Sequence, residues 1–139
     1  MIKRAFLWFY FLLPSRLRKR KKIFILCPVR EIASPVITIL AGYVARLEAA
    51  GHRVYWPYRD TDQVDPIGLR ICRDNRRGMR RSDVVYVCWD KESKGSHFDL
   101  GIAFVLGKPL VLINSDQVRR TEKKSFDNVL LALTRRISY

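Results

Sequence analysis

Cysteine and histidine are scarce in this chain of 139 residues, which contains three cysteines and two histidines. Cys27, Cys72 and Cys88 are widely spaced and form no CxxC pair. This argues against a zinc site and against a catalytic cysteine. Since Cys27 and Cys88 lie in apolar runs typical of strands, we expect buried free thiols in a reducing compartment. We expect the acidic segment 60–65 to be solvated, and the protein to need neither a metal ion nor a cofactor.

A long hydrophobic run is also lacking. The apolar stretch at residues 5–13, AFLWFYFLL, is about half of the roughly 20 residues that a membrane-spanning helix needs. The sequence PSRLRKR that follows it is a poor signal-peptide cleavage site. Three interpretations stay open for residues 1–22: attachment to an anionic membrane surface, a helix that packs on the domain, or upstream sequence included by a misplaced start.

Acidic residues are few, and the formal net charge is +14. Residues 1–22 carry eight basic residues and no acidic one, and the remainder of the chain is still basic. Such a charge attracts phosphates, whether on nucleotides, nucleic acid or lipid headgroups. Because no recognised nucleic-acid-binding motif is present, we consider nucleic acid the less favoured partner.

In the rest of the chain, short apolar runs alternate with segments whose apolar residues have helical periodicity. We interpret residues 1–21 as a basic, aromatic N-terminal extension and residues 22–139 as one α/β domain. Strands are predicted at residues 23–27, 54–56, 83–89 and 110–113, and helices at residues 35–50, 67–81, 96–106 and 125–134. This order predicts a doubly wound parallel sheet with helices on both faces, in three α/β/α layers. Ligands of such sheets bind beyond the carboxyl ends of the strands.

One segment beyond a predicted strand end has the composition of an anion site. Residues 93–101, SKGSHFDLG, lie between a buried strand and a helix. Small residues at a helix start leave backbone N–H groups and the helix dipole available to a phosphate. The hydroxyl of Ser93 and the nearby Lys94 add donors, and Asp99 follows near the same helix start. His97 could contact phosphate or base, or be an exposed residue without a role.

The pattern Ser93-x-Gly95-x-x-x-Asp99-Leu100-Gly101-x-Ala103, followed by Gly107-Lys108-Pro109, resembles the nucleoside 2-deoxyribosyltransferase superfamily. Within it, the pattern is most similar to the 2′-deoxynucleoside 5′-phosphate N-hydrolase branch, since Ser93 stands where that branch has its phosphate-binding serine. Arg30 and Asp74 also match residues of the family. The resemblance covers residues 22–114 and implies a flavodoxin-like, Rossmann-like fold.

The resemblance also implies a function. Family members cleave the bond between C1′ of a (deoxy)ribose and the base, and transfer the sugar to water or to a second base. Asp99 would be the carboxylate nucleophile, and Asp74 would orient the sugar or handle the proton of the leaving base. The 5′-phosphate of a nucleoside monophosphate would be held by Ser93, by the amides of Gly95 and Ser96, and by Arg30. A homodimer or larger oligomer is expected on the same basis. Separately, we expect a cytoplasmic location, with the inner membrane surface as the alternative.

Two positions depart from the family pattern. The usual nucleophile is a glutamate, and Asp99 is one methylene shorter; a displacement of about 1 Å can cost on the order of 100-fold in rate. The family also tends to have a tyrosine in the first strand, where this chain has Phe24. The alternative function is therefore a nucleotide-binding or sensing module without catalysis, held at a membrane by residues 1–22.

Overall fold

The computed structural model describes residues 19–134 of the chain. Four parallel strands form one sheet in the order β2-β1-β3-β4. They are β1 (Lys22–Leu26), β2 (Arg53–Tyr55), β3 (Val84–Val87) and β4 (Leu110–Leu112). The first strand pairs with both β2 and β3, so the chain moves outward in both directions from β1. The predicted parallel sheet is confirmed, and its order places a switch point between β1 and β3.

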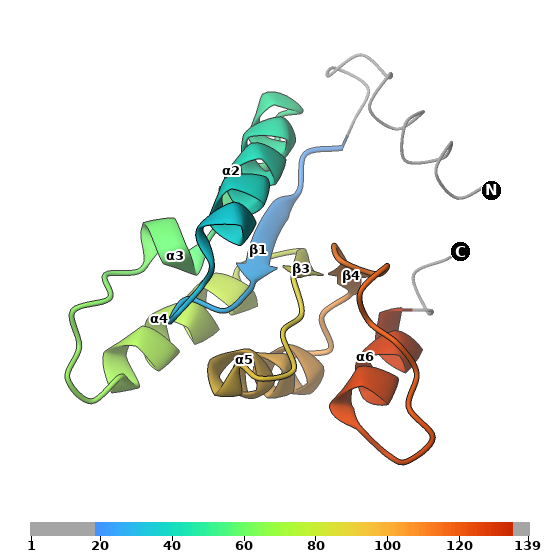
Figure 1. Cartoon of the computed structure of the whole chain (residues 1–139). Helices are drawn as coiled ribbons and strands as arrows, with labels where there is room; N and C mark the ends of the chain where they lie inside the picture. Colours follow the sequence, from blue (N-terminus) through green and yellow to red (C-terminus); the bar gives the residue numbers. More distant parts are fainter. Residues whose placement is uncertain (1–18, 135–139) are drawn as a thin grey trace.

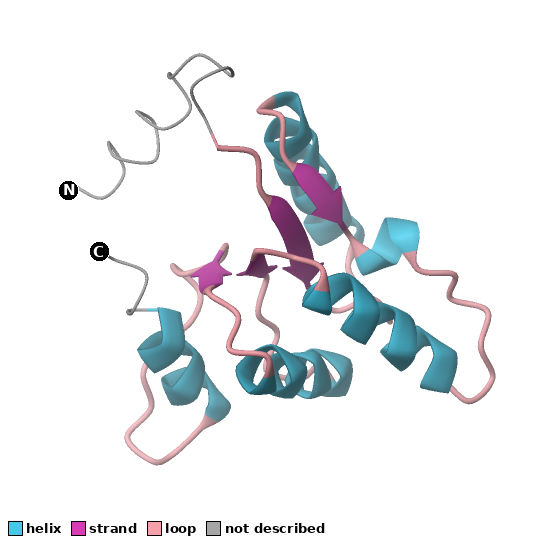
Figure 2. Ribbon diagram, turned by 180° about the vertical axis from the view of Figure 1, so that it is seen from behind, coloured by secondary structure: helices cyan, strands magenta, loops and turns pink. Residues whose placement is uncertain are grey.

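Helices cover both faces of this sheet (Figure 1, Figure 2). The helices are α2 (Ser34–Ala49), the short α3 (Pro57–Asp60), α4 (Leu69–Arg80), α5 (Lys94–Val105) and α6 (Phe126–Thr134). The predicted elements are all present with bounds that differ by a few residues. One short helix was not predicted: α3 begins at Pro57 and ends at Asp60, the first residue of the acidic segment 60–65.

Two apolar clusters hold the layers together because a strand sends alternate side chains to opposite faces. Ile23 and Ile25 of β1 pack with Leu40 and Val44 of α2. Phe24, on the opposite face, belongs to the cluster that contains Met79 of α4, Leu100 of α5 and Leu130 of α6. This explains why β1 is apolar without interruption, as expected for a strand that is covered on both sides.

The helix ends agree with local chemistry. Pro35 lies in the first turn of α2, where its fixed φ suits a helix and its missing N–H leaves no bond unmade. After α2, Gly51 adopts φ +90°, a left-handed conformation that glycine reaches without steric cost. Lys108 lies in the segment before β4, and its Nζ donates to the backbone oxygens of Arg80 at 3.0 Å and Ser82 at 2.6 Å. This contact stabilises the C-terminal end of α4.

The described residues bear on the expectations about metals, thiols and membranes. Among residues 19–134, no group of three or more His, Cys, Asp or Glu side chains could hold a metal ion. All three cysteines are free; Cys27 is buried and the other two are half-buried. Burial raises the pKa of the Cys27 thiol to about 12, which leaves it unreactive at neutral pH. None of the helices described has the length and apolar character needed to cross a bilayer.

Candidate functional site

The carboxyl ends of the strands meet at one edge of the sheet, which we call the carboxyl edge. The segments that leave this edge are those after β1, β2, β3 and β4, with α4 and α5 beginning near it. The helix α5 begins at Lys94, in the segment that follows β3, and carries Asp99 in its second turn. The opposite edge, from which the strands begin, is called the amino edge.

Asp99 is a buried carboxylate in the second turn of α5, with 8% of its surface exposed. One hydrogen bond from another side chain reaches it, from Nδ2 of Asn75 to Oδ2 of Asp99 at 3.3 Å. Burial raises the pKa of Asp99 from 3.8 to about 6 because desolvation disfavours the charged form, and the Asn75 hydrogen bond opposes this rise. The carboxylate is therefore ionised in most molecules at pH 7 but is a stronger base than an exposed aspartate.

Asn75 belongs to a chain of buried polar side chains that ends on Asp99. The Tyr55 hydroxyl lies 2.7 Å from Oγ1 of Thr61, and the Thr61 hydroxyl donates to Oδ1 of Asn75 at 3.1 Å. The Asn75 amide then donates to Asp99. The chain connects β2, the segment after α3, α4 and α5. The Asn75 amide is itself positioned by Thr61, and its bond to Oδ2 favours one orientation of the Asp99 carboxylate.

Asp74 occupies a different place from Asn75, although the two are adjacent in the sequence. Its Oδ2 accepts a hydrogen bond from Nη1 of Arg70 at 3.2 Å, and its Oδ1 accepts one from Nη1 of Arg77 at 3.1 Å. Adjacent residues of a helix point about 100° apart, so both cannot face α5. The structure thus brings Asn75, and not Asp74, to Asp99. The sequence contains one signal for the role of Asn75: it is a polar residue in the otherwise apolar stripe formed by Ile71 and Met79.

Ser93 is the N-cap of α5. Its Oγ accepts a hydrogen bond from the Ser96 backbone N–H at 3.2 Å, so the Ser96 amide is occupied within the protein. The N–H of Gly95 belongs to the first turn, whose amides have no partner within the helix. The hydroxyl oxygen of Ser96 is fully buried on the same helix face as Asp99, and it has no hydrogen-bond partner among residues 19–134.

The contacts of His97 and the position of Arg30 differ from those of Asp99. The His97 ring packs between Trp89, at a centroid distance of 4.7 Å, and Phe126, at 5.1 Å. Its Nδ1 lies 2.8 Å from the backbone oxygen of Ser93, which connects the ring to the helix cap. Arg30 is exposed in the turn after β1, next to Glu31, whose φ of 53° places it in the left-handed region.

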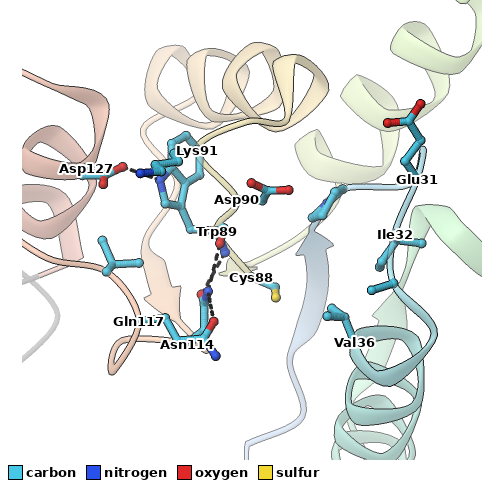
Figure 3. Close-up of a pocket in the computed structure, with 13 residues that line it drawn as sticks. Glu31, Ile32, Val36, Cys88, Trp89, Asp90, Lys91, Asn114, Gln117 and Asp127 are labelled. Carbon is cyan, nitrogen blue, oxygen red and sulfur yellow. Dashed lines mark hydrogen bonds between the residues drawn. The ribbon is translucent and has the colours of Figure 1, made fainter.

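A cavity of about 390 Å³ opens at the carboxyl edge between α2, the end of β3 and the segment after β4 (Figure 3). Its polar lining was not predicted from the sequence and includes Glu31, Asp90, Asn114 and Asp127. Asp127 accepts a hydrogen bond from the Trp89 indole N–H at 2.6 Å. Asp99, Ser93 and Arg30 are not among the lining residues. With three carboxylates and one lysine, this cavity suits a base or a sugar better than a phosphate.

Asn114 connects the ends of β3 and β4 beside this cavity. Its Oδ1 accepts from the Trp89 backbone N–H at 2.8 Å, and its Nδ2 donates to the Trp89 backbone oxygen at 2.9 Å and to Oε1 of Gln117 at 3.2 Å (Figure 3). This pairing continues the sheet beyond the last residues of both strands. It thereby positions Trp89 and the segment that leads to Ser93.

Comparisons with known proteins bear on this arrangement. A family model described as nucleoside 2-deoxyribosyltransferase matches residues 37–130, more than half of the chain. The match includes Asp74, Ser93, Gly95, Ser96, His97 and Asp99, and begins after Phe24 and Arg30. No curated protein matches the chain. Among solved structures, the fold is similar to that of a 2-deoxyribosyltransferase from the psychrotolerant bacterium Bacillus psychrosaccharolyticus, at 16% identity and a TM-score of 0.55. The similarity covers 78% of this chain and 89% of that one.

Proposed function

Because the chain belongs to the nucleoside 2-deoxyribosyltransferase family, we propose that it cleaves the N-glycosidic bond of a (deoxy)nucleoside 5′-monophosphate with Asp99 as nucleophile. The observation that carries this proposal is the environment of Asp99. It is a buried carboxylate, oriented by the amide of Asn75 and located near the N-terminal end of α5 at the carboxyl edge. A carboxylate in such an environment is less solvated, and its raised pKa makes it the better nucleophile.

The proposed reaction proceeds in two displacements. Oδ1 of Asp99 attacks C1′ of the sugar, since the Asn75 amide binds Oδ2. The bond from C1′ to the base nitrogen breaks, and its electron pair leaves with the base, which takes up a proton from water. The covalent glycosyl ester is then attacked at C1′ by water, giving hydrolysis, or by a second base, giving transfer. Both transition states resemble an oxocarbenium ion, whose positive charge the carboxylate stabilises.

The proposed phosphate site is the start of α5. Ser93 uses one lone pair of its Oγ to cap the helix, so its hydroxyl proton is available to a phosphate oxygen. The Gly95 amide and the positive end of the helix dipole point the same way. The exposed Arg30 would add charge from the turn after β1. Asp74, which the two arginines of α4 already neutralise, would act on the sugar or the leaving base only after exchanging those partners.

A second candidate function is nucleotide binding without catalysis, and one observation favours it. The cavity at the carboxyl edge is lined by Trp89, Asp90 and Asp127, whereas Asp99 is not among its lining residues. The base and sugar of a nucleotide could then occupy the cavity without bringing C1′ to the carboxylate. Two departures from the family pattern also favour binding without catalysis: the shorter side chain of Asp99 and the phenyl ring of Phe24, which has no hydroxyl.

We also propose that the protein works as a homo-oligomer in the cytoplasm. Apolar side chains on the outer surface of α5 support a contact with a second copy. Phe98 is 57% exposed, and Val105 is 84% exposed.

The experiment is the release of free base from ribo- and deoxyribonucleoside 5′-monophosphates, followed by chromatography. We expect release by the native protein and a loss of at least about 1000-fold in Asp99→Asn, since removal of a nucleophile costs several orders of magnitude. Glu122→Gln is the matched control, because Glu122 is an exposed acid between β4 and α6. Tight nucleotide binding with no release by the native protein would reject catalysis and support the second candidate.

A further inference from the structure

Two serines of the described residues are buried, and their hydroxyl groups differ in how they are satisfied. Ser82 and Ser96 have 6% and 1% of their surface exposed. The Ser82 hydroxyl donates a hydrogen bond to the backbone oxygen of Met79 at 2.6 Å. The Ser96 hydroxyl, in the first turn of α5, has no partner among residues 19–134. Because a buried hydroxyl without a hydrogen bond costs free energy, this group needs a physical reason.

The capping of α5 does not use the Ser96 hydroxyl. The N-cap is Ser93, whose Oγ accepts a hydrogen bond from the Ser96 backbone N–H at 3.2 Å. Ser96 thus contributes its amide to the cap and not its side chain. A helical serine often donates to a carbonyl oxygen one turn earlier, but within the described part of the chain the Ser96 hydroxyl forms no such bond. It is therefore an unused donor in the protein interior.

The carboxylate of Asp99 lies one helical turn away from this donor. Ser96 and Asp99 are three residues apart on the same face of α5, and side chains with this spacing are neighbours. Cα–Cβ bonds tilt toward the N-terminus of a helix, so the Asp99 side chain points toward the turn that contains Ser96. Among the described residues, Asn75 donates to Oδ2 of Asp99, and no donor reaches Oδ1. Rotation about the Cα–Cβ bond of Ser96 is enough to redirect its hydroxyl.

Solvent explains why Oδ1 needs no protein donor in the free protein. Asp99 keeps 8% of its surface exposed, so water can reach the carboxylate. A sugar placed with C1′ against Oδ1 covers this remaining surface. The loss of solvent disfavours the ionised form, and a protonated Asp99 is not a nucleophile. Substrate binding therefore works against the ionisation that the proposed reaction requires.

Charged side chains do not oppose this effect within the described residues. Burial and the Asn75 hydrogen bond are the causes of the shifted pKa of Asp99, with no charged group among them. The titratable groups that interact with Asp99 from other elements are the thiols of Cys27, after β1, and Cys72, in α4. Both thiols have a raised pKa and are neutral near pH 7. Residues 1–18, most of the N-terminal extension, lie outside the described part.

We propose that Ser96 is a positioning residue: when a substrate covers Asp99, the Ser96 hydroxyl turns to donate a hydrogen bond to Oδ1 and keeps the carboxylate ionised. One lone pair of Oδ1 accepts this bond, and another faces C1′. The hydroxyl transfers no proton and does not touch the substrate. This role rests on the proposed cleavage with Asp99 as nucleophile. It explains the unpaired hydroxyl, whose partner becomes available only in the complex.

The test is the pH dependence of base release from the nucleoside 5′-monophosphate that the native protein cleaves fastest, with Ser96→Ala and Ser82→Ala compared. The acidic limb of kcat reports the complex, and that of kcat/KM reports the free protein. In Ser96→Ala we expect the limb of kcat to move upward by about one pH unit, which corresponds to one charge-assisted hydrogen bond. The limb of kcat/KM should stay in place. Neither limb should move in Ser82→Ala, because Ser82 precedes β3 at the amino edge.

Urea denaturation gives a second readout that does not depend on activity. Ser96→Ala removes an unpaired buried hydroxyl, so its denaturation midpoint should rise. Ser82→Ala is the matched control, since it removes a buried hydroxyl that has a partner, and its midpoint should fall. Opposite signs in the two variants would show that the Ser96 hydroxyl is unpaired in the free protein.

Three results would overturn the proposal. If neither limb moved in Ser96→Ala, or both moved together, Ser96 would have no effect specific to the complex. A lower denaturation midpoint in Ser96→Ala would show that its hydroxyl already has a partner in the free protein. Both results leave the proposed function intact. A folded native protein that releases no base at any pH would reject the proposed function, and the role of Ser96 with it.

Discussion

The two edges of the sheet differ in how they hold charge. At the carboxyl edge an acid is buried: Asp99 of α5 accepts a hydrogen bond from the neutral side chain of Asn75 in α4. At the amino edge the charges are exposed, and Arg80 and Arg81 extend from the end of α4 into solvent. Burial changes the acid–base behaviour of the first group, whereas exposure leaves the second free for long-range attraction. The carboxyl edge therefore holds a carboxylate with altered acid–base behaviour, and the amino edge presents exposed positive charge.

The largest expected change in unfolding free energy comes from Asp99→Asn, which removes the cost of burying the carboxylate. Its pKa is raised from 3.8 in an unfolded chain to about 6 in the folded protein. The folded state therefore binds the proton more tightly, and stability falls as the pH rises through this interval. The difference amounts to about 3 kcal/mol at pH 8, at about 1.4 kcal/mol for each pKa unit. We expect Asp99→Asn to be more stable than the native protein at pH 8 and equal to it below about pH 4.

The measurement is urea denaturation of both proteins across this pH range. Asp83→Ala provides the comparison at the amino edge, since it removes the acceptor of the hydrogen bond from the Lys22 backbone N–H. That variant should lose about 1 kcal/mol at pH 8, the opposite sign. A destabilised Asp99→Asn at pH 8 would contradict the assignment of a desolvated carboxylate.

An intermediate effect is expected from Asn75→Ala. The substitution leaves the Thr61 hydroxyl and the Asp99 carboxylate without their partner, and should cost about 1–3 kcal/mol of unfolding free energy at pH 7. It should also move the pKa of Asp99 further upward, because the Asn75 hydrogen bond stabilises the ionised form.

Both quantities can be followed by denaturation at a series of pH values. Arg76→Ala, one residue further along α4 and exposed, is the control for a change within the same helix. If Asn75→Ala left the pH dependence of stability unchanged, Asn75 would be a packing residue and not a determinant of the Asp99 carboxylate.

The smallest effect concerns the start of α5. Ser93→Asp keeps an effective N-cap, because an aspartate oxygen can accept the same hydrogen bond from Ser96. Its negative charge should nevertheless repel a phosphate and lower the preference for nucleoside 5′-monophosphates over nucleosides by about 10-fold, with little change in stability. Isothermal titration with both ligands gives the preference. An unchanged preference would place the phosphate elsewhere, with the basic turn at Arg30 as the next candidate.

Much of the fold could be predicted from the sequence because its signals are local. The run at 23–27 has no polar residue, which requires cover on both faces, and the structure buries Ile23 and Phe24 on opposite sides of β1. The N-cap at Ser93 and the C-terminal glycine at Gly51 follow from side-chain and backbone chemistry within a few residues. These features depend little on distant parts of the chain.

The partners within the candidate site could not be predicted in the same way. The rotation of α4 on the sheet decides whether residue 74 or residue 75 contacts Asp99. Side chains of adjacent helical residues point about 100° apart, so only one of the two can do so. The apolar stripe of α4 indicates which residue faces the core, since Asn75 lies on this stripe between Ile71 and Met79. Asn114 and Asp127 had no local signal, because their contacts with Trp89 join segments that are 25 and 38 residues apart.

By itself, the sequence determined the order of the elements, the parallel sheet and the basic character of the chain, because apolar periodicity and composition act locally. Tertiary structure alone decided which groups meet. It placed Asn75 against Asp99, changing the environment of that carboxylate from solvent to protein interior. It also gathered Lys22, Arg53 and Arg81 around one groove. The physical reason is that pKa values and surface potential depend on distances in space, which packing sets and sequence separation does not.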